Sequence, residues 1–410
     1  MILHCALLLV KPLAMLINRL LLIFISISLI VITSVGLDRV AGLFSQSHDQ
    51  GIIFPRKVTL TLATREFSST VKTNSMGFRA REFVSQKTAR TRIVALGDSF
   101  TFGWGVNAEE SWPKLLEEHL KSSGLDVEIA NLGRPGGSPA TYADIAEKSV
   151  DLLHPDLLIV GILQGDDLAQ MGLPPVTEFA LGQDPHRLDI TARHPRLRSI
   201  AKRLYPHFLT MLDQRESNRH GVADDWQQIA QSVAASCNAG EHSRLDQLDE
   251  RVKKAFFAGE LNPSLVYLSL HMPDYFMQTM DLSSATTKLR ISHMAEQLAR
   301  IKSAAERNHA RVLVVAVPYG IYVSRASFET RQSIGFTATT EMLTSNAADE
   351  AIRQASQSAA VEFYEVTEQF RRSDQEFFFP LDGHLNRTGH AYFADVVTPI
   401  VRTALTGSNK

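Results

Sequence analysis

Five short runs of almost wholly apolar residues lie between residues 93 and 366, and stretches with helical periodicity separate them. These runs span residues 93–96, 127–132, 157–163, 312–317 and 361–366. Strands that are buried on both faces of a sheet need apolar side chains at nearly every position, and helices carry the chain back between them. The pattern therefore predicts an α/β protein with a parallel sheet of about five strands and helices on both faces.

The interval between the third and fourth runs opens to about 150 residues, far beyond an ordinary crossover between parallel strands. Helical stretches separated by proline-rich turns fill it, and we interpret residues 168–285 as a helical cap inserted after the third strand. The first part of this insertion is basic through Arg187, Arg193, Arg196, Arg198, Lys202 and Arg203. A solvated helix face explains such a charge run more simply than an anionic ligand does.

The N-terminal segment contains an uncharged apolar run from Leu20 to Leu37. A helix of about 20 such residues crosses the hydrocarbon core of a bilayer. Lys11 and Arg19 precede the run and Asp38 follows it, so the positive-inside rule places the N-terminus in the cytoplasm and the rest of the chain outside. A cleaved signal peptide is the alternative, although no clear cleavage site follows the run. The expected organisation is a cytoplasmic N-terminus with an anchor (1–38), a lead-in segment (39–90) and one large extracytoplasmic domain (91–410).

Composition excludes several classes of function. The net charge is −2, and no basic–aromatic interleaving is found, so nucleic acid is not an expected partner. The chain has two cysteines, Cys5 and Cys237, which are too few for a zinc cluster or a disulfide framework. No phosphate-binding loop, dinucleotide fingerprint or cluster with metal-ligand spacing is found, so the sequence predicts neither a cofactor nor a metal.

A candidate nucleophile follows the first apolar run, within Leu96-Gly97-Asp98-Ser99-Phe100-Thr101-Phe102-Gly103. Reactive groups of α/β sheets lie in the crevice beyond the carboxyl ends of the strands, and Ser99 falls there. A serine hydroxyl needs a neighbouring base before it becomes a useful nucleophile. The alternative is a strand-to-loop turn with a capping serine.

A candidate base follows the last apolar run, within Phe379-Pro380-Leu381-Asp382-Gly383-His384-Leu385-Asn386. A carboxylate two residues from a histidine can set the tautomer of the imidazole and stabilise the imidazolium that forms in catalysis. The alternative is a loop histidine beside the helix-capping Asn386. The combination of Ser99 with Asp382 and His384 is more specific than either segment alone.

With these segments in order, the chain resembles the SGNH (GDSL-type) hydrolase superfamily over roughly residues 73–405, apart from the insertion. The matching blocks are Gly97-Asp98-Ser99, Asn131-Leu132-Gly133, Gly165-Asp166-Asp167 and Asp382-Gly383-His384, preceded by the similar segment Thr73-Asn74-Ser75-Met76-Gly77-Phe78-Arg79. The resemblance implies a three-layer α/β/α sandwich of the flavodoxin-like kind. It implies Ser99 as nucleophile with His384 and Asp382 as its base and orienter. It also implies that the Gly133 N–H and the side chain of residue 166 face the oxyanion.

Two departures from the family pattern bear on activity. The Asp-x-His spacing is tighter than the common Asp-x-x-His and resembles the branch that includes alginate O-acetylation proteins, which raises acyl transfer as an option. The family's asparagine is Asp166 here, and an ionised carboxylate only accepts hydrogen bonds. Asp166 could be protonated, Gln164 could substitute for it, or Asp166 could point away and leave the N–H groups of Ser99 and Gly133.

The sequence thus favours hydrolysis of a small acyl ester through an acyl-Ser99 intermediate, with a small-molecule or glycan ester as substrate. The alternatives are an O-acyltransferase that acts on an envelope glycan, a non-catalytic module that binds carbohydrate or lipid, and a structural subunit of an envelope assembly. The insertion is expected to roof the site, with Tyr267, Tyr275 and Phe276 as candidate lining residues. Nothing in the sequence pattern indicates an oligomeric state.

Overall fold

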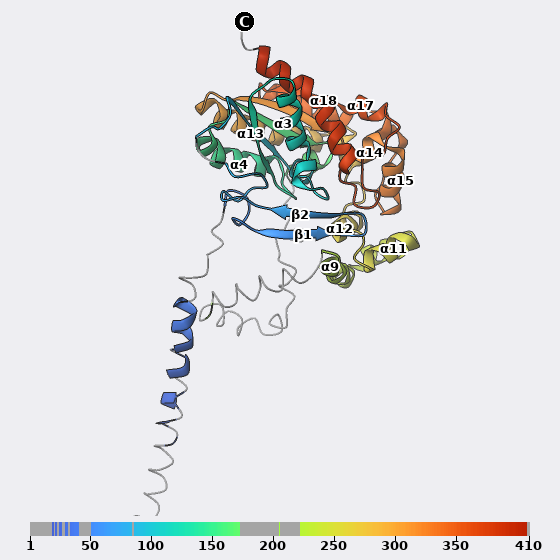
Figure 1. The fold of residues 1–410 in the computed structure, drawn as a ribbon. Coiled ribbons are helices and arrows are strands. Elements are labelled where there is room, and N and C mark those ends of the chain that lie inside the picture. The colour runs from blue at the N-terminus through green and yellow to red at the C-terminus, as the bar shows by residue number, and fades with distance from the viewer. Residues whose placement is uncertain are drawn as a thin grey trace, which may run out of the picture. The chain divides into compact units, whose positions relative to one another are not determined.

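The computed structural model describes residues 51–83, 86–172, 205 and 222–407, together with residues 19–40 except 20, 23, 27, 28 and 32. The chain divides into two compact units (Figure 1). One comprises residues 1–49 and 186–219, and the other comprises residues 50–185 and 220–410.

The described residues between 19 and 40 are helical. Their large apolar side chains are exposed, for example Leu22, Phe24 and Ile30, and within this unit the hydroxyl of Ser34 forms a hydrogen bond of 2.7 Å with that of Tyr205. Five residues of the predicted span 20–37, together with Cys5 and the basic stretch 187–203, lie outside the described residues. In the part of the chain that the structure describes, no helix is both long and apolar enough to span a bilayer.

The larger unit is built on a parallel five-stranded sheet. Its strands are β3 (Thr91–Gly97), β4 (Val127–Gly133), β5 (Leu157–Leu163), β6 (Arg311–Val317) and β7 (Glu362–Tyr364). They lie in the order β4-β3-β5-β6-β7, all parallel, and each corresponds to one of the five apolar runs. This is the flavodoxin-like order, whose topological switch point lies between β3 and β5.

Helices cover both faces of the sheet, as the alternation of buried side chains along β3 requires. Helices α3 (Trp112–Ser122) and α18 (Arg387–Thr406) share one apolar cluster with Ile93 and Ala95 of β3. Helices α4 (Pro139–Leu153), α13 (Ala285–Arg307) and α16 (Ala347–Ser358) share the other with Val94 and Leu96. Helices α4 and α13 lie against each other (Figure 1). The predicted three-layer sandwich is therefore confirmed.

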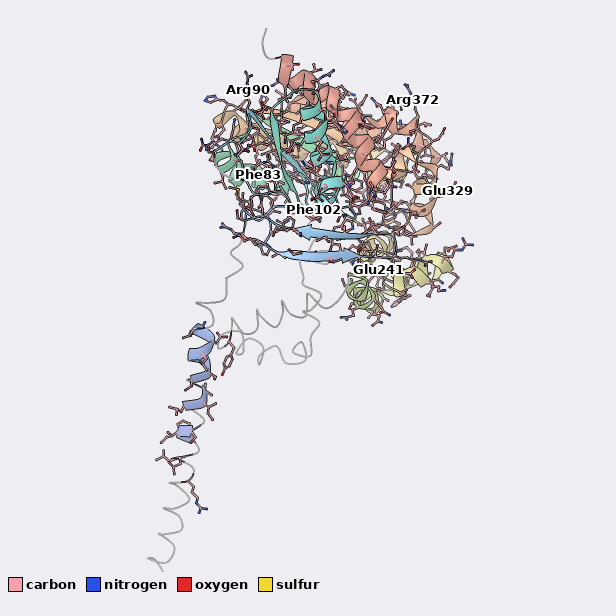
Figure 2. The ribbon with its side chains drawn as sticks, in the orientation of Figure 1. Phe83, Arg90, Phe102, Glu241, Glu329 and Arg372 are labelled. Carbon is pink, nitrogen blue, oxygen red and sulfur yellow. The ribbon has the colours of Figure 1, made fainter. Side chains whose placement is uncertain are left out.

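The lead-in segment forms a β-hairpin, of which the strand-like run Lys57–Ala63 predicts only the first strand. Strands β1 (Thr59–Ala63) and β2 (Ser68–Lys72) pair antiparallel. At the tip, the hydroxyl of Thr64 accepts hydrogen bonds from the N–H groups of Glu66 and Phe67. Phe67 packs into a small cluster with Phe102 and Trp104, and Phe102 lies where the hairpin meets the sheet (Figure 2). The lead-in is thus part of the unit that holds the sheet.

The part of the predicted insertion that the structure describes is helical. It comprises α5 (Asp166–Ala169), α9 (Val222–Ser236), α10 (Ala239–Gln247), α11 (Glu250–Phe257), α12 (Pro263–His271) and the 3-10 turn η4 (Met277–Thr279). Asn and Asp side chains cap several of these helices, which explains where they begin. The remaining elements are α2 (Ser99–Phe102), η1 (Ala108–Glu110), α14 (Gly320–Val323), α15 (Arg325–Ser333), η5 (Thr340–Leu343) and α17 (Thr367–Arg371).

Candidate active site

The candidate nucleophile Ser99 is the first residue of the short helix α2, which begins directly after β3. The Asp98 carboxylate caps this helix by accepting a hydrogen bond from the Phe100 N–H at 2.9 Å. Because β3 borders the switch point, Ser99 lies in the crevice at the carboxyl edge of the sheet, where such folds place their reactive groups.

The imidazole of His384 connects Ser99 with Asp382. Its Nε2 lies 2.7 Å from the Ser99 Oγ, and its Nδ1 lies 2.5 Å from the Asp382 Oδ1. With the proton on Nδ1, the ring donates to the carboxylate and leaves Nε2 free to accept the serine proton. The structure therefore brings the three predicted catalytic residues together in one hydrogen-bonded series.

The surroundings of Asp382 favour its ionised form. Burial opposes ionisation of this carboxyl, but the nearby His384 and Arg331 outweigh burial and hold its pKa below the usual value. The imidazole packs against Phe100 and Trp104, with ring centroids at 4.9 and 5.9 Å. These contacts fix the ring plane, so Nε2 stays directed at the serine.

Gly383 makes the short Asp-x-His spacing possible. It adopts the left-handed conformation (φ 85°), and the Asp382 carboxylate accepts a hydrogen bond from the His384 N–H as well as from its ring. A Cβ at this position would lie 1.4 Å from the Nη2 of Arg331. Both the backbone conformation and the packing therefore require glycine.

Gly133 is not part of the site, which corrects the prediction made for it. It is the last residue of β4, and its N–H donates to the side-chain oxygen of Asn131 at 2.9 Å. Gly133 also does not line the cavity that contains Ser99. Its N–H is therefore already engaged and cannot serve an oxyanion there.

Gly136, three residues later, is the alternative candidate for the donor predicted at Gly133. It lies in a turn closed by a hydrogen bond of 2.9 Å from the Gly137 N–H to the Arg134 carbonyl, with a φ of 68°. Gly136 lines the cavity beside Ser99, and among the described residues no partner is found for its N–H. The backbone N–H groups of Ser99 and Gly136 are therefore the candidates to stabilise a negative charge that develops beside Ser99. The sequence signal for this donor is the Pro135-Gly136-Gly137 turn directly after a predicted strand.

Asp166 lies at the carboxyl end of β5 and lines the same cavity. Each of its oxygens accepts one hydrogen bond, from the Tyr275 hydroxyl at 3.0 Å and from the Gln170 amide at 2.6 Å. Burial raises the pKa of this carboxyl, although both hydrogen bonds and the nearby His384 act in the opposite direction. Position 166 therefore presents an acceptor with a raised pKa.

Gln164 cannot take over the donor role. Its amide nitrogen donates to Asp349 and Thr367, both at 2.7 Å, and its oxygen accepts a hydrogen bond from the Tyr319 N–H at 3.1 Å. The side chain is fully engaged in the interior, so this alternative is wrong.

Two further carboxyls lie close to Asp166. Asp167 is buried and accepts hydrogen bonds from the Leu163 N–H and the Tyr142 hydroxyl, both at 2.8 Å, and burial raises its pKa well above the usual value. Burial, followed by the charge of Asp166, raises the pKa of Asp98 to about 7. Like charges in one site disfavour simultaneous ionisation, and burial raises the pKa of all three carboxyls.

A cavity of about 690 Å³ opens over Ser99 and His384. Its apolar wall includes Trp104, Leu163, Met171, Leu265 and Leu268, the last two from α12 of the insertion. Its carboxyl groups are those of Asp98, Asp144, Asp166, Glu296 and Asp382, and no Lys or Arg is found among the described residues that line it. The insertion thus forms part of the wall of the site.

Of the three aromatic residues predicted to line the site, only Tyr275 does so. Tyr267 packs on His271, with ring centroids at 3.9 Å. Phe276 is buried between Tyr319 and Phe336. No group of three or more His, Cys, Asp or Glu side chains that could hold a metal is found in the described part of the chain.

The doubly wound sheet and the Ser–His–Asp series at its carboxyl edge define a site of the serine hydrolase class. No family model matches the chain. An arylesterase of Vibrio mimicus is 31% identical over 87 residues, which are 21% of this chain and 42% of that protein, so the match spans less than half of the curated relative.

Solved structures with similarity to the chain are esterases and acylhydrolases. They include an acetyl xylan esterase (12% identity, 76% of this chain and 99% of that one, TM-score 0.34) and a lipase/acylhydrolase from Enterococcus faecalis (10%, 77% and 96%, TM-score 0.36). Another is the esterase EstA from Pseudoalteromonas (10%, 77% and 98%, TM-score 0.35).

Proposed function

We propose that this protein hydrolyses an ester of a small acyl group through an acyl-Ser99 intermediate. The observation that carries the proposal is the 2.7 Å contact between the Ser99 Oγ and the His384 Nε2, continued to Asp382 at 2.5 Å. A non-catalytic binding module has no need of this series, and a catalytic site requires it.

The reaction follows from the geometry. The Ser99 Oγ attacks the carbonyl carbon while its proton passes to the His384 Nε2, and Asp382 stabilises the imidazolium. The N–H groups of Ser99 and Gly136 stabilise the oxyanion. The ester C–O bond then breaks, and the alcohol leaves with the proton from His384. Water then attacks the acyl carbon while it gives a proton to the His384 Nε2. The bond from the acyl carbon to the Ser99 Oγ breaks, His384 returns the proton to the Oγ, and the acid leaves.

The cavity favours a neutral substrate. Its wall is largely apolar, and its charged side chains are carboxylates without a facing Lys or Arg among the described lining residues. An anionic acyl or alcohol group would lose its hydration in this cavity and meet like charges, which costs binding free energy.

Transfer of the acyl group to a glycan is a second outcome of the same chemistry. It differs from hydrolysis only in the acceptor that attacks the acyl-Ser99 intermediate. The Asp-x-His spacing favours this alternative by resemblance, and the Leu265–Leu268 side of the cavity offers a wall along which an acceptor other than water could bind. Product analysis with and without a polyol acceptor separates the two.

We also propose that the N-terminal apolar run anchors the protein in a membrane and that the active site lies outside the cytoplasm. Support comes from the exposure of large apolar side chains in the described helical residues, such as Phe24, which is 68% exposed, and Ile30, which is 66% exposed. Exposed apolar side chains in such number require an apolar environment or a partner surface.

Turnover of p-nitrophenyl acetate by the full chain, compared with the Ser99→Ala protein, tests the proposal. Wild-type turnover that Ser99→Ala abolishes supports it, together with covalent labelling of Ser99 by a fluorophosphonate. A wild type that neither turns over esters nor becomes labelled would overturn it.

A further inference from the structure

The tip of the lead-in hairpin holds the backbone of the loop that carries Asp382 and His384. The two carboxylate oxygens of Glu66 accept hydrogen bonds from the N–H groups of Leu381 at 2.8 Å and Asp382 at 2.7 Å. Each oxygen therefore has its own donor. Burial raises the pKa of Glu66, and these two hydrogen bonds act in the opposite direction by favouring the ionised carboxylate.

Arg331 binds the carbonyl groups of the same two residues, Leu381 and Asp382. Its Nη1 donates to the Leu381 carbonyl and its Nη2 to the Asp382 carbonyl, both at 3.0 Å. The backbone polar groups of both residues are thus bound from two different elements, the hairpin and helix α15. Such complete engagement leaves this part of the loop little freedom to move.

The hairpin tip is itself anchored beside the base. Thr64 orients the tip through its hydroxyl, and Phe67 packs against Trp104 and Phe379, with ring centroids at 6.4 and 5.1 Å. Trp104 in turn packs on His384. The hairpin therefore reaches the base both through the loop backbone and through this aromatic packing.

We propose that Glu66 is a positioning residue of the active site, which sets the place of Asp382 and hence of His384 through the loop N–H groups. The proposal rests on the proposed function for its consequence in catalysis, and on the hydrogen bonds alone for its effect on the loop. Glu66 does not touch a substrate in the cavity, since it does not line it.

Glu66→Gln is the informative variant, because it keeps the size of the side chain and places an amide N–H₂ against a loop N–H. One of the two hydrogen bonds is then lost and replaced by a donor–donor contact. A displaced base lowers the rate of proton transfer, and small displacements near the reacting atoms cost about tenfold to hundredfold in kcat. KM should change little, because the cavity wall is intact.

Arg65→Gln is the matched control. Arg65 lies on the same hairpin tip, is exposed, and pairs with Glu260 at 2.9 Å away from the loop. It should keep the kcat of the wild type. Glu66→Asp retains a carboxylate and should recover part of the activity that Glu66→Gln loses.

Hydrogen exchange gives a readout that does not depend on turnover. In Glu66→Gln, the amides of Leu381 and Asp382 should exchange faster than in the wild type and in Arg65→Gln, with the remaining amides unchanged. Unchanged exchange at these two amides would overturn the proposal even if no ester substrate is found. A fall in kcat that accompanies an equal fall in the folded fraction, without recovery in Glu66→Asp, would reduce Glu66 to a residue of the fold and also overturn it.

Discussion

The hydroxyl of Tyr275 donates a hydrogen bond of 3.0 Å to the carboxylate of Asp166, so a side chain of the insertion controls the charge beside the nucleophile. The resemblance to SGNH hydrolases implies an amide donor at position 166. Here the position holds an acceptor whose pKa is raised by burial, and Tyr275 and Gln170 partly counteract the rise. The rate of the reaction is therefore expected to depend on whether Asp166 is protonated.

The first prediction concerns the pH dependence of kcat. Below the raised pKa of Asp166 the group is neutral, and as pH rises through this pKa a negative charge appears near the developing oxyanion and opposes it. The wild type should lose activity on this alkaline side. Asp166→Asn has no group to ionise, so its kcat should stay level there and exceed the wild-type value by up to about 10²–10³-fold. The measurement is the pH profile of kcat for the wild type and for Asp166→Asn. Identical losses of activity at alkaline pH in both proteins would contradict the prediction.

Tyr275→Phe tests the same interaction from the other partner. The hydroxyl stabilises the ionised carboxylate, so its removal raises the pKa of Asp166 further and moves the alkaline limb to higher pH. The variant keeps the ring in the cavity wall. If the alkaline limb of the kcat profile moves to lower pH in Tyr275→Phe, or does not move, Asp166 is not the titrating group.

The second prediction concerns the triad as a unit. Ser99→Ala and His384→Ala should each abolish turnover, and the double variant should be little worse than either, because groups that act in one step are not additive. Asp382→Asn should lower kcat by up to about 10⁴-fold through the wrong imidazole tautomer. The measurement is kcat on p-nitrophenyl acetate, and wild-type rates in His384→Ala would remove the base assignment.

The third prediction tests Gly136 as the oxyanion donor. Gly136→Ala forces a side chain into a left-handed conformation, so the turn should shift and carry its N–H away from the oxyanion. Loss of one such donor lowers kcat by about 10²–10³-fold. Gly124→Ala is the control, since Gly124 has a similar φ of 87° and a Cβ added there would meet no atom within 4 Å. Equal effects of both substitutions on kcat would mean that backbone strain alone is responsible.

The fourth prediction concerns stability. The pKa of Asp98 rises from the usual 3.8 to about 7 in the folded chain. Between these values the folded state holds a proton that the unfolded state has lost, so the free energy of unfolding falls as pH rises through this window, by at most about 1.4 kcal/mol per pH unit. Asp98→Asn should flatten this decline. Urea unfolding across the window measures it, with Asp246→Asn, a substitution of an exposed aspartate, as the control.

The fifth prediction concerns the N-terminal run. If it anchors the chain, the protein should stay with the membrane fraction after high-salt and carbonate washes, because neither treatment weakens apolar burial in a bilayer. A reporter at the C-terminus that is active only outside the cytoplasm should be active. Recovery of a soluble protein that begins near Asp38 would establish cleavage instead.

The sheet could be predicted because strands buried on both faces are apolar throughout. Each of the five runs became a strand of the sheet, and the long interval after the third one became a helical insertion where the structure describes it. Strand β2 was missed because SSTVK alternates exposed and buried residues and carries little apolar signal. Its partner β1, rather than its own sequence pattern, makes it a strand.

The site could be predicted only where the role of a residue follows from the chemistry of its side chain. Ser99, His384 and Asp382 have residue types that point to their roles. The choice between Gly133 and Gly136 depends on which backbone N–H is already engaged, and a residue type does not record that. Glu66 was missed because its partner Leu381 lies 315 positions away and nothing periodic connects them.

The separation of the triad along the chain affects how the protein is made. Ser99 leaves the ribosome 285 residues before His384. A nascent or prematurely terminated chain therefore contains the nucleophile without its base. Such a product cannot cleave an ester by this mechanism, so reactivity arises only after the loop that carries the base has been made and folded.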